Sequence, residues 1–569
     1  MVHPPTGAAR VKAKPNKNGK LAAPSDEPPR APADATPKSL REMTDLVVRQ
    51  EATLRQGGGD AGHARQRKLG RLPVRERLQR LLDPGAPVIE LNLWAGYEMY
   101  PDVGDVPAAG VVTGVGYVCR RPVVFVANDA TVKAGAFFPA TSKKVLRAQR
   151  VAMRCNLPLV YLVDSAGVYL PMQDEIFPDE DDFGRIFRNN AVISAMGIPQ
   201  FAAVMGNCVA GGAYLPVLSD KILMTAGSEL YLAGPALVKA AIGQVTSAEE
   251  LGGARMHAQI SGTVDFFEET DESCLQRLRA LIDLLPPAPR RDEFAEAATD
   301  PARPGTDLYS LVSLDGRKEY DVRHVLDCVV DRNSLNEYKH DYGQTLVCAY
   351  AAIGGRKVGI VASQRLRTKS PRGELQIGGV IYHDSADKAA RFIMDCEQSR
   401  LPVVFFQDVT GFMVGRDSEQ AGIIRAGAKL VNAVSNVTVP KITVVIGGSF
   451  GAGNYALCGK AFDPTFIFAW PSAKYAVMGG AQAANTLLQL EQRQAERLGK
   501  KLTDPEIAAL RHRITSDYEH KTDIRYGAAR GWVDAIIAPE QTREVLTTAL
   551  EVACRPPPPG GFRSGVFQV

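Results

Sequence analysis

An internal duplication of about 240 residues constrains this chain more than any other feature. The segment LPLVYLVDSAGVY (157–169) can be laid over LPVVFFQDVTGFM (401–413) at an offset of 244 residues. Asp164 and Asp408 then coincide, and two further blocks match at offsets of 235 and 241 residues, so insertions between the copies are small. Because each copy is as long as a domain, the sequence predicts two similar domains and not a solenoid of short repeats.

Each copy has the alternation of strands and helices that is typical of a layered α/β domain. Apolar runs bounded by turn signals predict buried strands, and apolar residues at helical spacing predict the helices between them. In the first copy we expect strands over 110–129, 157–164 and 198–206, and helices over 39–82, 141–156 (capped by Thr141 or Ser142) and 183–195. In the second copy we expect strands over 354–363 and 401–413, a helix over 385–400 and a long polar helix from 487 to about 518.

Changes in composition mark the expected domain boundaries. Residues 1–38 contain eight prolines, which argues against an amphipathic helix and predicts a disordered tail. The Pro-rich segment 286–305 reads as a linker between the two domains. The predicted organisation is a disordered tail (1–38), an N-terminal domain (39–290), a C-terminal domain (305–553) and a second disordered tail (554–569).

Each copy also contains a glycine-containing turn between a buried strand and a helix. In the first copy this turn is VMGNCVAGGAYL (Val204 to Leu215), and in the second it is VIGGSFGAGNYAL (Val445 to Leu457). The N–H groups at such a turn have no partner within the helix and lie at the positive end of its dipole. The repeat aligns Gly211-Gly212 with Ala452-Gly453, and such small residues let a ligand approach the main chain closely. A duplicated pair of this kind favours two oxyanion sites over simple close packing of helix and strand.

Two other motifs overlap the second turn. Gly447 to Gly451 fits the GxSxG pattern of a serine hydrolase, with Ser449 as the nucleophile. The first turn has Cys208 at that place and no histidine is near either turn in sequence, which disfavours this interpretation, although folding could bring a histidine close. Gly451-x-Gly453-x-x-Ala456 resembles a dinucleotide-binding turn, but no acidic residue follows about 20 positions later at a second strand end.

Asp164 and Asp408 end their strands at equivalent places. A catalytic acid pair is one interpretation, and capping of the following turn is the one that we favour. The chain has no HExxH motif, no Cys/His cluster and no EF-hand loop, so we expect no bound metal. The acidic run PDEDDFG (178–184) is expected to form a solvated loop and a helix cap.

Charge and cysteine usage disfavour several other classes of function. The formal net charge of +4 is supplied by residues 1–38, which hold seven Lys/Arg against three Asp/Glu, so a nucleic-acid surface is not implied. The nine cysteines form no CxxC pair and several lie in apolar runs, which favours reduced, buried thiols and a cytoplasmic location. No apolar run reaches the roughly 18 residues of a membrane span, and the N-terminus lacks the apolar core of a signal peptide.

Nine segments of the chain share the motifs of one protein family. They include YLVDSAGVYLP (161–171), VMGNCVAGGAY (204–214), PKITVVIGGSFGAGNYALCG (440–459) and FAWPSAKYAVMGGAQAAN (468–485). Through these segments the chain, from about 45 to 553, resembles the carboxyltransferase subunits of biotin-dependent acyl-CoA carboxylases, most closely the β subunits of the methylcrotonoyl-CoA type. The resemblance implies an α/β fold of two tandem crotonase-like (ClpP/crotonase superfamily) domains, which agrees with the duplication.

The resemblance also implies where the chemistry takes place. The N-terminal domain would bind the acyl-CoA and the C-terminal domain the carboxybiotin, with the active site between the N-terminal domain of one subunit and the C-terminal domain of another. Gly211 and Gly212 would hold the thioester oxygen as it becomes an enolate, and liberated biotin would take the proton. Ala452 and Gly453 would hold the ureido oxygen of biotin. The further residues expected to contact substrate are Ala166, Gly167, Val168, Ala210, Gly411, Phe412 and Gly451.

Departures from the family pattern leave the identity of the acyl group of the substrate undecided. Ala134, Ala166, Val168 and Met172 differ from the common methylcrotonoyl pattern, and DSAGV and PMQDE lean toward glutaconyl-CoA decarboxylase subunits. DVTGF (408–412) stands where propionyl-type enzymes typically have DVPGF, which disfavours a small saturated acyl group. We expect 3-methylcrotonoyl-CoA or a similar branched or unsaturated acyl-CoA as the substrate. The alternatives are a glutaconyl-type decarboxylase subunit and a propionyl- or geranyl-CoA carboxylase β subunit.

Partners follow from what the chain lacks. It has no MKM biotinylation site and no ATP-grasp-like phosphate loop, so we expect biotin to arrive as carboxybiotin on a partner that carries biotin carboxylase and biotin carrier. The resemblance further implies a homo-hexamer. A crotonase-type hydratase, isomerase or hydrolase is another alternative, but the helix after the first turn offers only Asp220 as an acid. A non-catalytic scaffold is disfavoured because both glycine turns are intact.

Overall fold

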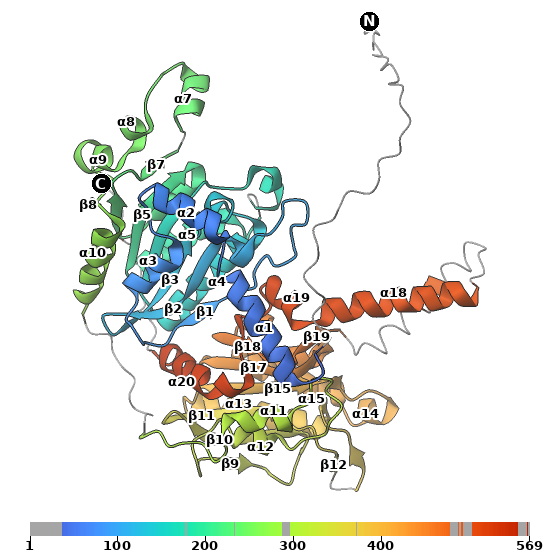
Figure 1. The fold of residues 1–569 in the computed structure, drawn as a ribbon. Coiled ribbons are helices and arrows are strands. Elements are labelled where there is room, and N and C mark those ends of the chain that lie inside the picture. Colours follow the sequence, from blue (N-terminus) through green and yellow to red (C-terminus); the bar gives the residue numbers. More distant parts are fainter. Residues whose placement is uncertain are drawn as a thin grey trace, which may run out of the picture. The chain divides into compact units, whose positions relative to one another are not determined.

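Two eight-stranded sheets form the core of the fold, one from each copy of the repeat (Figure 1). The computed structural model describes residues 37–176, 179–232, 234–286, 296–370, 373–477, 488, 491–492, 503–555 and 566. Residues Lys38–Val569 form one compact unit, within which the two halves contact each other directly.

The first sheet has the order β1-β2-β3-β4-β5-β6-β8, and β7 pairs with the far end of β5. The first three strands are antiparallel, whereas the pairs from β3 onward are parallel. Strands β3 to β6 are almost fully buried, which fits their continuous apolar sequence and the helices on both faces. The strands are β1 (Ile89–Leu91), β2 (Val111–Val118), β3 (Arg121–Asn128), β4 (Leu159–Ser165), β5 (Gln200–Val209), β6 (Lys221–Thr225), β7 (Glu229–Tyr231) and β8 (Phe266–Glu268).

The second sheet repeats this topology strand for strand. Its order is β20-β18-β17-β15-β11-β10-β9 with β19 on β17, so β9 takes the place of β1 and β20 that of β8. The strands are β9 (Asn336–Tyr338), β10 (Leu346–Ile353), β11 (Arg356–Ser363), β15 (Val403–Val409), β17 (Lys441–Phe450), β18 (Phe466–Ala469), β19 (Lys474–Ala476) and β20 (Ala535–Ile536). Two small pairs are added, β12 (Thr368–Lys369) with β13 (Leu375–Gln376) and β14 (Val380–Ile381) with β16 (Gly411–Phe412).

Helices cover both faces of each sheet. In the first half α4 and α5 cover one face, and α3 and α10 cover the other. These helices are α1 (Leu40–Leu54), α2 (Gly59–Lys68), α3 (Val74–Leu81), α4 (Pro139–Cys155), α5 (Phe183–Ala195), α6 (Tyr214–Val217), α7 (Pro235–Ile242), α8 (Ala248–Gly252), α9 (Ala254–Met256) and α10 (Asp271–Asp283). The second half has α11 (Leu308–Leu311), α12 (Val322–Leu326), α13 (His383–Gln398), α14 (Arg416–Gln420), α15 (Ile423–Asn436), α16 (Gly451–Ala456), α18 (Asp504–Thr522), α19 (Ile524–Ala529) and α20 (Thr542–Ala553).

Most predicted strands and helices are present with small shifts at their ends, whereas the helical stretch predicted over 39–82 is three helices and the strand predicted over 401–413 is divided into β15 and β16. The cap of α4 also differs from its prediction. The helix begins at Pro139 and its N-cap is Phe138, because proline is well suited to the first turn. Thr141 lies inside the helix, where its hydroxyl accepts the N–H of Phe138 at 2.9 Å. Most of the predicted tails, the centre of the linker and the first part of the polar helix expected from 487 lie outside the described residues.

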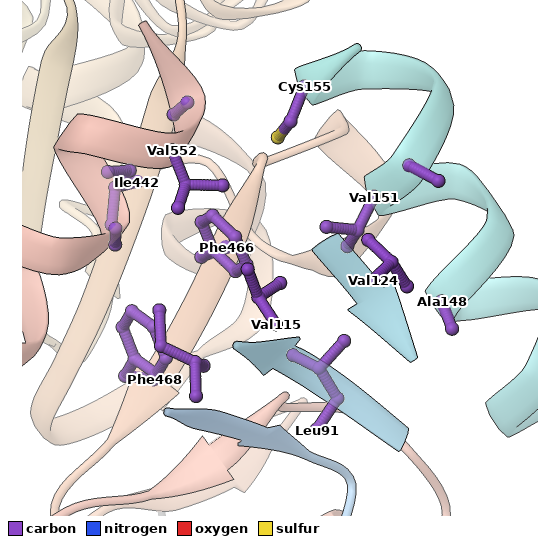
Figure 2. Close-up of a cluster of buried hydrophobic side chains, with 14 of the residues drawn as sticks. Leu91, Val115, Val124, Ala148, Val151, Cys155, Ile442, Phe466, Phe468 and Val552 are labelled. Carbon is purple, nitrogen blue, oxygen red and sulfur yellow. The ribbon is translucent and has the colours of Figure 1, made fainter. Parts of the chain in front are cut away.

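The two halves share an apolar core (Figure 2). Side chains of α4 in the first half and of β18 and α20 in the second half belong to the same buried cluster. Figure 2 shows this cluster with Leu91, Val115, Val124, Ala148, Val151 and Cys155 from the first half and Ile442, Phe466, Phe468 and Val552 from the second. Burial of this apolar surface holds the halves together in one unit.

A buried ion cluster lies at the same junction. Asp534, just before β20, is fully buried and accepts hydrogen bonds from Arg147 Nε at 2.8 Å and Arg147 Nη2 at 2.7 Å. Lys460 Nζ donates to the same carboxylate at 2.6 Å. Burial would raise the pKa of Asp534, but the charges of Arg147 and Lys460 outweigh it and hold that pKa well below its ordinary value. Burial, with the nearby Arg147 charge, lowers the pKa of Lys460 to about 8.

Helix α1 packs against the C-terminal half, although the predicted domain boundaries assign it to the N-terminal domain. Leu46 belongs to the same buried cluster as Ile467 of β18. The guanidinium of Arg41 lies 3.6 Å from the ring centroid of Tyr309. The structure therefore ties the start of the chain to its second half, while the domain boundaries themselves stay a prediction.

The described residues show neither a membrane-spanning helix nor a cluster of metal ligands. None of the helices in the described ranges is long and apolar enough to cross a membrane. In the same part of the chain, no group of three or more His, Cys, Asp or Glu side chains is placed to hold a metal ion.

Candidate active site

The strands that precede the two glycine turns end in equivalent bulges. The register between β4 and β5 shifts on either side of Asp164, and that between β15 and β17 shifts on either side of Asp408. A bulge re-aims the side chain at a strand end. Both aspartates are 3% exposed, so each carboxylate is placed in the interior beside the turn of the neighbouring strand.

Asp164 contacts two cations and one N–H group beside the first turn. Arg77 Nη1 lies 3.2 Å from Oδ2, and Arg71 Nη1 lies 3.7 Å from Oδ1. The N–H of Asn207 donates to Oδ1 at 3.2 Å. Burial raises the pKa of Asp164, and the two arginine charges act against that rise. The carboxylate therefore joins the end of β4 to the last residues of β5, just before the first glycine turn.

Asp408 has the same role in the second half with different partners. The N–H of Gly448 donates to Oδ1 at 2.8 Å, and the hydroxyl of Tyr320 donates to Oδ2 at 2.8 Å. Arg365 Nε lies 3.2 Å from Oδ2. Burial raises the pKa of Tyr320 well above its ordinary value, and the charge of Asp408 adds to this rise.

The glycine before each turn makes room for this carboxylate. A Cβ on Gly206 would lie 2.0 Å from Asp164 Oδ1, and a Cβ on Gly447 would lie 2.4 Å from Asp408 Oδ1. Both contacts are closer than real Cβ atoms come to other atoms. The hydrogen bonds and ion pairs of Asp164 and Asp408 indicate that these carboxylates position the turns and do not act as a catalytic acid pair. The capped N–H groups belong to the neighbouring strand and not, as the sequence suggested, to the turn that follows each aspartate.

The backbone that follows each aspartate pairs with another segment of its own half. That segment comes after β3 in the first half and after β11 in the second. In the first half the N–H of Phe137 donates to Gly167 O at 2.8 Å, and the N–H of Tyr169 donates to Phe137 O at 2.9 Å. In the second half β14 pairs with β16, and the N–H of Met413 donates to Ile381 O at 2.8 Å. This pairing fixes the backbone that faces each glycine turn.

The second glycine of each turn faces a glycine of that paired segment. A Cβ on Gly212 would lie 3.9 Å from Gly167 Cα and would meet no other atom within 4 Å. A Cβ on Gly453 would lie 2.7 Å from Val409 Cγ2 and 3.3 Å from Gly411 Cα. The first turn therefore borders free space where a ligand atom can reach the main chain, whereas the second is tightly packed on this side.

The structure brings the predicted site residues together in two groups, one per half. Each group lies at the carboxyl ends of the parallel strands, where open α/β sheets bind ligands. The first group is Ala166, Gly167 and Val168 after β4 with Ala210, Gly211 and Gly212 in the 3₁₀ turn after β5. The second group is Gly411 and Phe412 in β16 with Gly451, Ala452 and Gly453 at the start of α16.

The side chains within these groups differ in exposure. Ala166 and Ala452 are exposed, whereas Val168 and Phe412 are partly buried and pack against the apolar cores. Gly451 has φ +53°, and a Cβ there would lie 2.9 Å from Val477 O, so glycine is required. Backbone groups and small residues therefore dominate both sites.

Neither side chain at the hydrolase position is an available nucleophile. Ser449 is 1% exposed, donates to Gln407 Oε1 at 2.6 Å and accepts from Asn454 Nδ2 at 2.8 Å. Burial, with the nearby Asp164 charge, raises the pKa of the Cys208 thiol. No histidine of the described residues hydrogen-bonds to either side chain. The serine hydrolase interpretation is therefore not supported.

The residues that hold the two aspartates were not predicted from the sequence. Arg77 is 87 residues from Asp164, and Tyr320 is 88 residues from Asp408, so only the fold brings them together. The repeat does contain one signal for the segments that pair beside the glycine turns. Gly135 and Gly379 match at the offset of 244 and have φ of +67° and +77°, and each starts the loop that pairs beside a turn.

Comparison with known proteins assigns the family. Residues 65–557 match the family model described as the carboxyl transferase domain. The chain belongs to the carboxyl transferase family. The biotin-dependent 3-methylcrotonyl-coenzyme A carboxylase β1 subunit of Mycobacterium tuberculosis is 45% identical to this carboxyltransferase over 514 residues, which cover 90% of this chain and 94% of that protein.

Two further relatives of this carboxyltransferase cover nearly all of the chain. The mitochondrial methylcrotonoyl-CoA carboxylase β chain of Arabidopsis thaliana is 43% identical, over 90% of this chain and 86% of its own length. The crystal structure of the geranyl-CoA carboxylase β subunit of P. aeruginosa superposes with a TM-score of 0.81 at 35% identity, covering 94% of this chain and 99% of that one.

These comparisons confirm the predicted family, the crotonase-type α/β fold and the enzyme class. The chain is a carboxyltransferase subunit of the biotin-dependent acyl-CoA carboxylase type. The roles of the site residues in the two glycine turns stay a prediction.

Proposed function

We propose that this carboxyltransferase moves a carboxyl group from carboxybiotin to a branched, unsaturated acyl-CoA, with 3-methylcrotonoyl-CoA as the first candidate. The observation that carries the proposal is the pair of equivalent glycine turns at the ends of β5 and β17. Each turn would supply one backbone oxyanion site. The names of the relatives at 45% and 43% identity support the acyl group. Geranyl-CoA is the second candidate, because the structural neighbour at 35% identity is named for it.

The proposed reaction develops negative charge on two oxygens. N–H groups of Gly211 and Gly212 would stabilise the thioester oxygen as it becomes an enolate, and those of Ala452 and Gly453 would stabilise the ureido oxygen of biotin. Each donor of this kind lowers the activation free energy of the reaction by about 3 kcal/mol. The free space beside Gly212 supports this assignment, because an oxygen can reach the main chain there.

No side-chain base is needed for this transfer. The C–N bond of carboxybiotin breaks, the acyl-CoA loses a proton from the carbon that forms the new C–C bond, and the freed biotin nitrogen takes that proton. The partners of Asp164 and Asp408 support this, since both carboxylates are committed to holding the turns. The chain then acts by binding, by orientation and by its backbone dipoles.

Exposed apolar side chains around both turns support a site shared between two copies. Three pairs of equivalent residues are each at least 48% exposed, and the same positions recur in both halves. A repeated apolar rim of this kind marks a surface that another protein covers. We propose that the N-terminal half of one copy faces the C-terminal half of a second, so that the acyl-CoA and biotin sites form one cavity. The pairs are Leu170 and Val414, Tyr214 and Tyr455, and Leu232 and Val477.

A biotin-carrying subunit is the proposed partner, because the relatives are named as β subunits or β chains of carboxylases. Six copies of this chain are the proposed core of the complex. The cytoplasm is the proposed location, and the eight cysteines from Cys119 to Cys458 are free thiols, which fits a reducing compartment. Several relatives are named as mitochondrial, which is the alternative location.

The purified chain, mixed with a partner that carries biotin carboxylase and biotin carrier, is expected to fix labelled bicarbonate into acyl-CoA in an ATP-dependent manner. Rates should be compared for 3-methylcrotonoyl-, geranyl-, propionyl- and glutaconyl-CoA. The proposal predicts the highest kcat/KM for 3-methylcrotonoyl-CoA, because both the sequence pattern and the relatives favour a branched, unsaturated chain.

The other outcomes of this assay separate the alternatives. Highest activity with geranyl-CoA would select the second candidate substrate. Activity with propionyl-CoA alone would refute the branched-chain assignment. Release of CO₂ from glutaconyl-CoA without any ATP-dependent fixation would show that the chain works as a decarboxylase subunit.

A further inference from the structure

A basic cavity of about 450 Å³ lies at the end of the second sheet that is opposite to its glycine turn. Pro402 and Pro440 line the cavity and directly precede β15 and β17, so it lies at the amino ends of these strands. The glycine turn follows the carboxyl end of β17, which has ten residues and therefore spans roughly 30 Å. The cavity is thus separate from the proposed site of carboxyl transfer.

Five cationic side chains and one carboxylate line this cavity. The carboxylate is that of Glu397, which accepts the N–H groups of Thr438 at 2.8 Å and Val439 at 3.0 Å. The cations come from four segments, namely α4, the start of β11, and the residues that follow α13 and α20. They are Arg154, Arg356, Lys357, Arg400 and Arg555.

Two of the five cations have a carboxylate partner that does not line the cavity. Lys357 Nζ lies 2.6 Å from Glu296 Oε1. The guanidinium of Arg154 pairs with the carboxylate of Asp463. The charges of these two side chains are therefore largely balanced.

The other three cations lack such a partner. Among the residues that the structure describes, none forms an ion pair or a side-chain hydrogen bond with Arg356, Arg400 or Arg555. Arg555 Nε is shielded from solvent and has no acceptor in the same part of the chain. Burial, with the nearby charge of Arg121, lowers the pKa of Arg555. Three like charges in one cavity repel one another, and an anion among them would be attracted by all three.

The duplication shows which of these arginines the fold requires. Only the arginine at the start of β11 recurs, since β3 also begins with an arginine. Arg400 aligns with Asn156 at the offset of 244. Arg555 stands two residues after α20, and Leu285 stands two residues after α10. The first half therefore builds the same end of its sheet with an amide and an apolar side chain at these two positions.

The backbone at position 400 is unfavourable for arginine. Arg400 has φ +54°, and the aligned Asn156 has φ +49°. Asparagine visits this left-handed region routinely, whereas most other residues are strained there. Residues held in such conformations are frequent at ligand-binding sites. The arginine at this position thus meets a need other than ending the helix.

The chemistry of the cavity favours a phosphorylated ligand. A guanidinium is a planar fork of donors that matches the oxygens of a phosphate group. A diphosphate offers more oxygens and more negative charge to three arginines than a single phosphate does. The volume of the cavity is within the range of small-molecule sites. No aromatic side chain is among its described lining residues, so the ligand would be recognised by its phosphates and not by stacking of a base.

We propose that this cavity binds a diphosphate group, either as inorganic pyrophosphate or as part of a nucleoside diphosphate. The diphosphate oxygens would accept hydrogen bonds from Arg356, Arg400 and Arg555. With Arg154 of α4 in the same lining, the anion would join the first half of the chain to three segments of the second. The site does not depend on the proposed carboxyl transfer, since neither glycine turn takes part in it.

Calorimetric titration of the full-length chain with pyrophosphate tests the proposal. One site per chain is expected. The variants Arg400→Asn and Arg555→Leu introduce the first-half residues and should each weaken Kd by about 10- to 100-fold, because a charge-assisted hydrogen bond is lost. Arg317→Asn is the control, since Arg317 is an exposed arginine outside the cavity, and it should bind as wild type does. Equal Kd values in wild type and both cavity variants would overturn the proposal.

Titration with ADP distinguishes the two sources of the diphosphate. Tighter binding of ADP than of pyrophosphate would identify a nucleoside diphosphate as the ligand, and weaker binding of ADP would identify the inorganic anion. Binding of neither compound would exclude a diphosphate site.

Thermal unfolding separates a ligand site from a structural cluster. Without the anion, Arg400→Asn is expected to unfold at a temperature at least as high as wild type, because it removes a like charge and an unfavourable backbone conformation. Pyrophosphate should raise the midpoint of wild type more than that of the variant. A lower midpoint of the variant without the anion would contradict the proposal. So would an equal rise in wild type with sodium chloride at the same ionic strength.

Modification by phenylglyoxal, followed by peptide mass measurement, locates the bound anion. Pyrophosphate is expected to protect Arg356, Arg400 and Arg555 and to leave Arg317 reactive. Protection of none of the three would rule out the site. If a biotin-carrying partner protected them and pyrophosphate did not, the cavity would be a protein-docking surface and the proposal would be wrong.

Discussion

Replacing Gly212 with valine is expected to lower kcat for carboxyl transfer by at least about 10²-fold while leaving the fold intact. The reason is the geometry around this residue. A Cβ at 212 would meet only Gly167 Cα, at 3.9 Å, so a side chain would occupy the space through which a ligand oxygen approaches the backbone. The added methyl groups would keep that oxygen away from the N–H donors of the turn.

A graded series makes this prediction sharp. Gly212→Ala should give a smaller loss than Gly212→Val, and far-UV circular dichroism and native mass should match wild type in both. Gly184→Ala is the matched control, since a Cβ there meets nothing within 4 Å, and it should keep full activity. Wild-type kcat in Gly212→Val would disprove the assignment of this turn as an oxyanion site.

Replacing Asp534 with alanine is expected to destabilise the protein by about 3–5 kcal/mol. The change would leave Arg147 and Lys460 in the interior without their shared carboxylate. It would also remove the acceptor for the Ile467 N–H in β18. Urea unfolding followed by circular dichroism measures the loss. Asp517→Ala is the control, because Asp517 pairs with Lys521 at the surface of α18 and its loss should cost less than about 1 kcal/mol.

The same carboxylate predicts a pH dependence. The pKa of Asp534 is held below its ordinary value of 3.8 in the folded protein, so the folded state binds its proton less readily than the unfolded state. Its stabilising contribution is therefore complete above the ordinary value and is lost as the pH falls below 3.8 toward the folded pKa. The free energy of unfolding should fall more steeply with acid in wild type than in Asp534→Ala. Parallel curves would contradict the assignment.

The repeat made much of the fold accessible from sequence. Matching Asp164 with Asp408 predicted two equivalent sheets, and both bulges lie at those residues. The glycine turns are predictable because small residues recur between a buried strand and a helix in both copies. These features are local, so their signals lie within a few residues of each other.

Other features depend on contacts between distant segments. Arg77 and Tyr320 carry no local signal that they will meet an aspartate, since each lies more than 80 residues from its partner. The packing of α1 on the C-terminal half was missed because an amphipathic helix shows that it has an apolar face but not which surface will cover it. The α4 cap was misplaced because helix ends are less well determined by sequence than helix interiors.

The position of α1 has a consequence for folding during synthesis. Arg41 of α1 contacts Glu540, 499 residues later in the chain, and Leu46 packs in a cluster with Ile467 and Ala528. A ribosome therefore releases α1 long before its partners exist, and contacts of such high sequence separation form slowly. The part of α1 that packs on the second sheet stays uncovered until that sheet forms, whereas its contacts with Leu93, Trp94 and Ala108 of the first half can form earlier. A nascent chain of this protein should thus depend on chaperone protection of its first helix until the second sheet is complete.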